Sequence, residues 1–284
     1  IKPCGLDGTL LEGGELTQFS ITLLTSSYEV YKAYADKWGD ITKELKELRD
    51  TWLRRGYPFV EAVYALGLAI LATHAGQDID AETTKAALWL AGFGIHQVFD
   101  SSTVDVVIRL LRPLRDQYLD GWASLLSYVA NVGITDLVHE ELDEIYGHVS
   151  NLEDWAKAKL ADAYAMAAYW TKGKAYLVDK ACPLLNEIKD DVLRIIAGAH
   201  VYYRLAIIRV PYFNVNPCME LEVINQRLEK LREETSNPRE FLNNHPKLEE
   251  YLRWSGVVKP EEALNAVIKE AHVFALSGLG FCAK

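Results

Sequence analysis

The segment 217–235, PCMELEVINQRLEKLREET, indicates most directly how this chain folds. Its large apolar residues recur three or four positions apart, at Leu221, Ile224, Leu228 and Leu231, and we call these four the leucine seam. That spacing places them along one side of an α-helix, because a helix turns once every 3.6 residues. Charged residues fill most of the positions between them. The segment therefore predicts a helix with one narrow apolar side and charged surfaces elsewhere.

The same helical periodicity extends over nearly the whole chain of 284 residues, whereas the alternation typical of strands is almost absent. Prolines, glycines and capping residues divide it into about a dozen helices joined by short connections. The expected helices run from Glu15 to Trp38, between Asp40 and Gly56, from Pro58 to Ala75, from Ala81 to Phe99, from Ser102 to a break at Pro113, from Trp122 to Val132, from a cap at Thr135, from a capping box at Ser150–Glu153 to Thr171, from Lys174 to Val210 with an interruption at Pro183, over 217–235, near Pro238 and Pro246, and from Pro260 to about Ser277.

Three regions follow from these breaks. Residues 1–14 are rich in glycine and predict an irregular N-terminal lead-in, residues 15–210 a main helical domain, and residues 217–284 a C-terminal helical segment packed on it. The clearest break is Pro211–Pro217. We expect an all-α fold built of antiparallel helical hairpins, with its core in the helices near 58–75, 84–98, 156–171 and 192–210.

Composition narrows the range of functions. The formal net charge is −10, and an acidic surface repels phosphate backbones, so we expect no general binding of nucleic acid. The longest apolar run, 59–73, contains Glu61 and is shorter than the roughly 20 residues of a membrane span, so no membrane segment is expected. The first residue is Ile1, which is consistent with a processed product or a piece of a longer protein.

The four cysteines, Cys4, Cys182, Cys218 and Cys282, lie far apart and form no CxxC pair, which excludes zinc-ribbon and thioredoxin patterns. We expect buried free thiols, as is usual for cytoplasmic proteins. The alternative is a set of long-range disulfides, such as one joining Cys4 to Cys282, which would indicate secretion or a hyperthermophilic source.

One helix pair carries a repeat-like pattern. Trp122, Leu125, Val129, Gly133, Val138, Leu142 and Ile145 follow the rhythm of a large residue, small residues, a glycine turn and a second apolar helix. The pattern resembles the tetratricopeptide repeat, although Leu126 and Val138 replace a glycine and an alanine of that family. The resemblance implies an α-solenoid whose concave face binds a peptide or a protein. An irregular multi-helix bundle is the alternative architecture.

A second motif is Arg194-x5-His200-x-Tyr202. It resembles the Arg-x4-6-His motif of the HEPN family of small helical ribonucleases. The resemblance implies metal-independent RNA cleavage, in which Arg194 stabilises the phosphate charge, His200 acts as general acid or base, and Tyr202 assists in positioning. On a helix, however, six residues turn the chain by about 600°, so Arg194 and His200 do not share a face. A hydrogen-bonded core histidine is the competing interpretation.

Three charged groups are candidate sites. Arg109, Arg112 and Arg115 step along one expected helix and could bind an anion, or they could pair with surface carboxylates. The cluster His139–His148 contains several acidic residues but lacks the second Glu-x-x-His of ferritin-like metal sites, and Asp190–Asp191 lacks the third acidic residue of isoprenoid synthases. We therefore expect a solvated acidic face, no metal and no cofactor.

The sequence favours a scaffold or adaptor that binds a protein or peptide partner without catalysis. The leucine seam is the expected site of pairing with a partner or with a second copy of the chain. Besides the ribonuclease, a small-molecule-binding bundle is a further alternative, suggested by the supply of 7 Trp and 15 Tyr.

Overall fold

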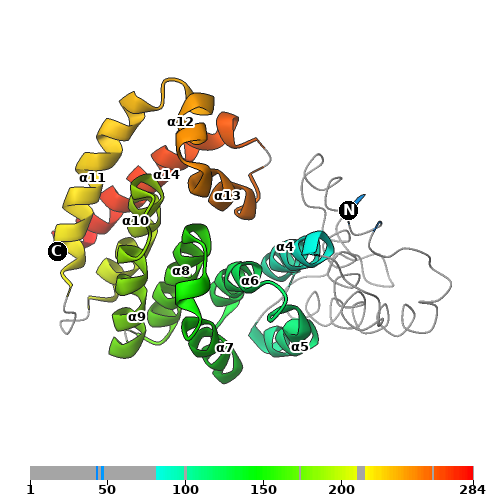
Figure 1. Cartoon of the computed structure of the whole chain (residues 1–284). Helices are drawn as coiled ribbons and strands as arrows, with labels where there is room; N and C mark the ends of the chain where they lie inside the picture. Colours follow the sequence, from blue (N-terminus) through cyan, green and yellow to red (C-terminus); the bar gives the residue numbers. More distant parts are fainter. Residues whose placement is uncertain are drawn as a thin grey trace, which may run out of the picture. The chain divides into compact units, whose positions relative to one another are not determined.

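The computed structural model describes residues 43, 46–47, 81–98, 101–172, 174–209, 215–257 and 259–283. Over this part of the chain every regular element is helical, which confirms the expected all-α class (Figure 1). Lys43, Lys46 and Glu47 are helical. The other expectations for residues 1–80, including the lead-in, the first three helices and Cys4, lie outside the described residues.

The chain divides into two compact units, residues 1–141 and 142–284. This division falls within a helix and does not coincide with the break at 211–217. In the first unit the described helices are α4 (Ala81–Val98), α5 (Ser101–Leu111), the 3-10 helix η2 (Arg112–Leu114), α6 (Leu119–Val132) and most of α7 (Asp136–Tyr146). In the second they are η3 (Val149–Asn151), α8 (Asp154–Trp170), α9 (Ala175–Asn186), α10 (Asp191–Ile208), α11 (Pro217–Glu234), α12 (Pro238–Asn244), α13 (Pro246–Trp254) and α14 (Pro260–Cys282).

Helices α4 and α6 form the main described contact of the first unit. They approach closely at Gly92, where an added Cβ would lie 2.7 Å from the ring of Tyr128. Helix α5 ends at Leu111, two residues before Pro113, which lies inside η2, as the missing N–H of proline predicts. Thr135 caps α7, because its Oγ1 accepts a hydrogen bond from the Val138 N–H. The tetratricopeptide-like residues are buried, but the main described neighbour of α6 is α4, and the repeat stays a prediction.

The second unit is built around α8 and α10. These two helices pack on each other, α9 packs on α8, and α10, α11 and α14 pack pairwise as a group of three (Figure 1). Asp154, at the start of α8, accepts hydrogen bonds from the backbone N–H groups of Lys189 and Asp190, just before α10. Helices α8 and α10 therefore begin at the same end of the unit. Near that end, the ring of Trp155 stacks on Trp254 of α13, with centroids 4.9 Å apart.

Two helix boundaries differ from the sequence prediction. The capping box at Ser150 does not form: Ser150 lies in η3, and α8 begins only at Asp154. The interruption expected at Pro183 is also displaced, because α9 continues through Pro183 to Asn186. The break follows instead from the cap of the next helix, since the Asp190 side chain accepts a hydrogen bond from the Leu193 N–H.

The cysteine prediction needs correction. Cys218 at the start of α11 and Cys282 at the end of α14 form a disulfide, so the expectation of free thiols is wrong for these two residues. The long-range alternative was right in kind, but it named a different partner for Cys282. Cys182 is a buried free thiol, as expected. The bond joins the first turn of one helix to the last turn of its neighbour, which fixes α11 and α14 as antiparallel.

Candidate partner-binding pocket

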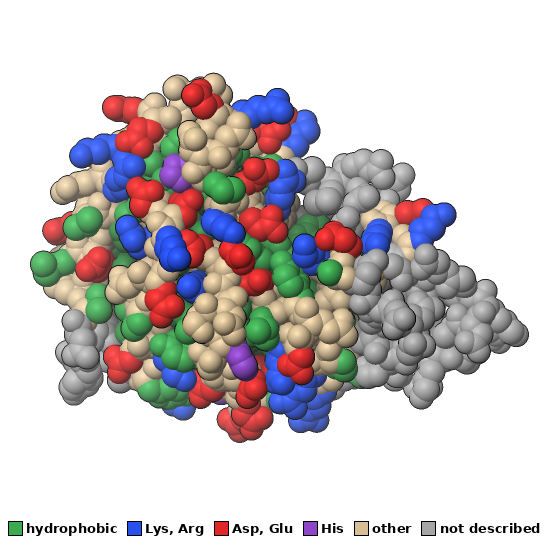
Figure 2. Space-filling view, in the orientation of Figure 1, with side chains coloured by type: hydrophobic (Ala, Val, Ile, Leu, Met, Phe, Trp, Pro, Cys, Tyr) green, Lys and Arg blue, Asp and Glu red, His purple; other side chains and the backbone are tan. Residues whose placement is uncertain are grey.

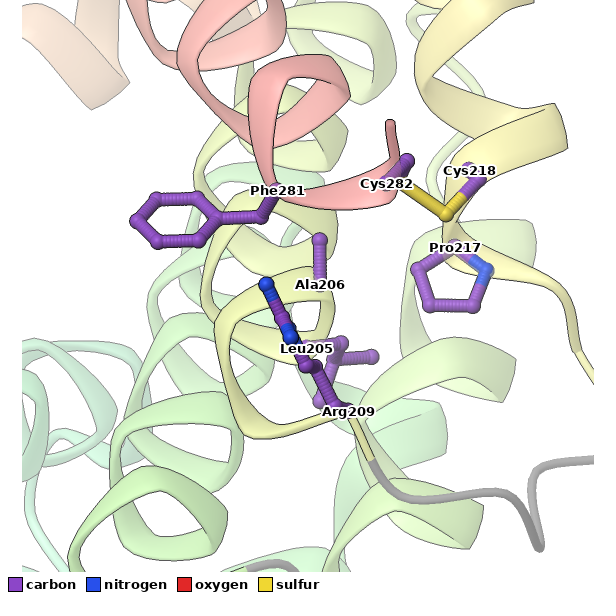
Figure 3. A pocket seen from close by; sticks show the side chains of 7 residues that line it. All are labelled: Leu205, Ala206, Arg209, Pro217, Cys218, Phe281 and Cys282. Carbon is purple, nitrogen blue, oxygen red and sulfur yellow. A yellow bond between two sulfur atoms is a disulfide. The ribbon is translucent and has the colours of Figure 1, made fainter. Parts of the chain in front are cut away.

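The end of α10, the start of α11 and the end of α14 meet around a pocket of about 270 Å³ (Figure 3). Its lining is almost entirely apolar and includes the disulfide. We call it the Arg209 pocket, and its lining residues are Leu205, Ala206, Arg209, Pro217, Cys218, Phe281 and Cys282.

Local sequence features position each wall. Arg209 ends α10 in the left-handed region, with a φ of 52°, which turns the chain out of the helix. Asn216 caps α11 by accepting a hydrogen bond from the Cys218 N–H, and Pro217 supplies the preset φ of a first helical residue. The disulfide then holds the third wall, α14, against this start.

Arg209 is the one charged residue among the described residues that line the pocket. In Figure 3 its side chain lies between Phe281 on one side and the disulfide on the other. It makes no hydrogen bond or ion pair with any of the residues that the structure describes. Of the seven arginines of this unit, three form ion pairs: Arg204 with Asp162, Arg227 with Glu234, and Arg253 with Glu249. Arg209 therefore offers a carboxylate-binding fork beside an apolar cavity.

Two exposed apolar side chains lie on the side of α11 that faces away from the leucine seam. Met219 directly follows the pocket residue Cys218, and Val223 lies one turn further on the same side of the helix. They are 63% and 61% exposed.

A buried polar network lies in the middle of the same unit. Lys159 of α8 donates a hydrogen bond to Ser255 Oγ and lies over the ring of Tyr251. Burial lowers the pKa of Lys159 to about 7. Burial, followed by the positive charge of Lys159, lowers the pKa of His200 to about 4.

Two further members of this network are also shifted by burial. Burial lowers the pKa of Arg204 to about 10 and raises that of Tyr251 to about 12. Arg204 pairs with Asp162, so its charge is compensated inside the protein. Lys159 thus joins α8 to α13, and Arg204 joins α10 to α8, so we assign these groups a structural role.

The ribonuclease-motif residues are not brought together. Arg194 is exposed and donates to the backbone oxygen of Ile188. His200 contacts the ring of Phe274, with centroids 4.5 Å apart, on α14. Tyr202 is buried and forms a hydrogen bond with Cys182 of α9; burial and these neighbours raise its pKa. The three side chains therefore point toward different parts of the unit, as the helical angle predicts.

Two of the three arginines considered as an anion site, Arg112 and Arg115, contact Glu141 of the cluster His139–His148. Glu141 is fully buried, and its carboxylate lies 2.7 Å from Arg112 and 3.5 Å from Arg115. The Trp122 indole also donates to it, over 3.2 Å. The expectation of a solvated acidic face is therefore wrong for Glu141. Arg112 and Arg115 form ion pairs with this carboxylate, whereas Arg109 is exposed.

Elsewhere, charges of both signs are interspersed. Lys and Arg side chains alternate with Asp and Glu side chains on the face drawn in Figure 2. Asp143, which belongs to the cluster His139–His148, forms an ion pair with Lys180 over 2.5 Å. Surface ion pairs of this kind recur among the described residues, as between Lys259 and Glu262.

The leucine seam is buried within the second unit. Leu221, Ile224, Leu228 and Leu231 are buried. Leu221 reaches Gly278 of α14, and Ile224 reaches Gly198 of α10, so both glycines leave room for the seam. The helices that cover this seam belong to the same chain. Sequence reasoning did not find the Arg209 pocket, although Pro211–Pro217 marked the break on which it depends.

Comparison with known proteins assigns the chain to no family: no family model, curated protein or solved structure matches it. None of the described helices has the length and apolar character needed to cross a membrane.

Proposed function

We propose that this chain is a non-catalytic helical binding protein, and that the Arg209 pocket anchors an acidic segment of a protein or peptide partner. The observation that carries the proposal is the guanidinium of Arg209, which makes no ion pair with the described residues and borders an apolar cavity. Arginine binds carboxylates in two-pronged geometry, and arginine is enriched among the residues that dominate protein interfaces.

The size of the pocket favours a peptide over a free small molecule. Its volume, about 270 Å³, lies just below the range of about 300–1,000 Å³ typical of small-molecule sites. A cavity of this size suits one large apolar side chain of a longer partner. The partner expected from this chemistry has a large apolar residue next to a carboxylate.

A selection experiment tests the proposal. A phage-displayed library of random peptides is selected on the intact, oxidised chain, and the selected peptides are labelled for fluorescence anisotropy. We expect them to combine an acidic residue or a free C-terminus with a large apolar residue. Arg209→Gln should weaken their binding by about tenfold or more, as expected for a lost hydrogen bond to a charged group. Arg232→Gln, at an exposed arginine of α11, is the matched control and should bind as the wild type does.

Two outcomes would contradict the proposal. The first is that the selected peptides bind Arg209→Gln as tightly as the wild type. The second is that N-acetyl-leucine alone binds as tightly as whole peptides, because the site would then be a small-molecule pocket. Circular dichroism of each variant checks that the helices are retained.

A further inference from the structure

Three side chains with metal-binding atoms converge at the start of α10. Asp190 and Asp191 belong to this helix end, and His245 lies between α12 and α13. One potential ligand atom from each lies within 4.8 Å of the other two. His245 Nδ1 is 3.2 Å from Asp190 Oδ2 and 3.3 Å from Asp190 Oδ1.

These separations suit a metal ion. Zinc binds histidine nitrogen and carboxylate oxygen at about 2.0–2.2 Å in tetrahedral geometry, which places neighbouring ligand atoms about 3.3 Å apart. The distance between His245 and Asp190 is compatible with this value and is equally that of a hydrogen bond, while the three potential ligand atoms together lie within 4.8 Å. The imidazole comes from a residue 55 positions away in the sequence, so the site is not simply a run of acidic residues.

Two of the three ligands are held in place by their surroundings. The Asp190 side chain is only 8% exposed and also accepts a hydrogen bond from the Leu193 N–H. The ring of His245 stacks on Phe241, with centroids 4.6 Å apart and the planes 29° from parallel. Contacts of this kind orient the ligands of metal sites and strengthen metal binding.

Asp191 is the adjustable ligand. Its side chain is 53% exposed, and Arg227 lies 3.8 Å from its carboxylate. Arg227 has a closer partner in Glu234, at 2.6 Å, which raises the pKa of the guanidinium. Asp191 is therefore only loosely paired and can turn toward an ion without breaking a short contact.

We propose that Asp190, Asp191 and His245 bind one first-row divalent transition-metal ion, with zinc as the expected ion and water completing its coordination. The imidazole favours this class over magnesium or calcium, which prefer oxygen ligands alone. The ion would tie the α12–α13 corner to the start of α10. This site is separate from the Arg209 pocket and does not depend on the proposed function.

Cobalt and zinc titrations test the site on the full chain after treatment with a chelator. We expect visible absorption from bound Co²⁺ and a calorimetric stoichiometry of one Zn²⁺ per chain. His245→Gln and Asp191→Asn should each weaken binding by at least about tenfold, since even the loss of an outer contact costs 10–100-fold. Zinc should also raise the melting temperature of the wild type by several degrees but not that of His245→Gln.

His148→Gln is the matched control, because His148 is exposed and also lies near a carboxylate, 4.0 Å from Glu144. It should bind zinc as the wild type does. Absence of zinc binding to the wild type, or equal binding by His245→Gln, would overturn the proposal and leave a histidine–aspartate hydrogen bond only. Circular dichroism confirms that the variants are folded.

Discussion

Lys159 donates a hydrogen bond from Nζ to Ser255 Oγ over 2.7 Å, although the two residues are 96 positions apart. This contact joins α8 to the residue that ends α13. Tyr251 lies under the same ammonium group, 4.7 Å from Nζ to the ring centroid. The buried amine of Lys159 thus links two helices, and the strength of this link depends on pH.

The first prediction concerns this amine. Burial holds the pKa of Lys159 at about 7, below its ordinary value of 10.5. Between these values the unfolded chain binds more protons than the folded one, so the free energy of unfolding rises with pH. We expect a gain on the order of 2 kcal/mol from pH 7 to pH 9, at about 1.4 kcal/mol per unit. Urea unfolding at several pH values should show a flatter slope for Lys159→Met. The exposed Lys269→Met is the control, and equal slopes in Lys159→Met and the wild type would contradict the assignment.

The second prediction concerns acid. The pKa of His200 is lowered to about 4, so the folded state keeps the imidazole neutral while the unfolded state protonates it below about 6.5. Stability is therefore lost as the pH falls from 6.5 toward 4. We expect His200 to account for on the order of 3 kcal/mol of that loss. His200→Asn should lose less stability over this interval, measured by chemical denaturation, whereas His148→Asn should follow the wild type.

The third prediction concerns the disulfide. Cys218 and Cys282 are 64 residues apart, and closing a loop of this size stabilises a fold by about 4 kcal/mol in the chain-entropy estimate. Phosphine reduction should lower the melting temperature of the wild type by on the order of 10 °C. The double variant Cys218→Ser/Cys282→Ser should melt at the lower temperature with or without the reductant.

Cys182→Ala is the control for the reduction experiment. Burial raises the pKa of the Cys182 thiol to about 11, so this residue stays unreactive near neutral pH. The variant should keep the full difference between oxidised and reduced melting temperatures. A wild-type melting curve unchanged by the reductant would show that the bond does not stabilise the fold.

The fourth prediction compares two glycines of α14. A Cβ on Gly278 would lie 2.5 Å from Leu221 Cδ1 and 3.3 Å from the Tyr203 Cα, so Gly278→Ala should cost about 1–3 kcal/mol. A Cβ on Gly280 meets nothing within 4 Å. Gly280→Ala should therefore stabilise the helix by about 0.5–1 kcal/mol. Thermal melts in parallel test both, and equal effects would refute the packing argument.

The sequence predicts the C-terminal helices well because their signals are local. Prolines start α11, α12, α13 and α14 at the expected positions, and the spacing of the leucine seam identifies the buried side of α11. Where local signals compete with distant partners, the prediction fails. Asp154, rather than Ser150, marks the start of α8, at the position where it also binds the chain before α10.

The candidate sites depend on contacts between distant segments, which one sequence does not reveal. Glu141 resembles its exposed neighbours until Arg112 and Arg115 enclose it. Arg209 becomes a pocket residue only because Phe281 and Cys282 return to the end of α10. His245 likewise gives no local sign that it faces Asp190.

The Cys218–Cys282 bond makes every residue between them part of a covalent ring. A protease that cuts one peptide bond in the connections between α11, α12, α13 and α14 opens this ring but releases no fragment. The two pieces stay attached through sulfur, and the packed helices keep them in register. A nicked chain would thus keep the mass of the intact one, apart from an added water, until a thiol separates the pieces.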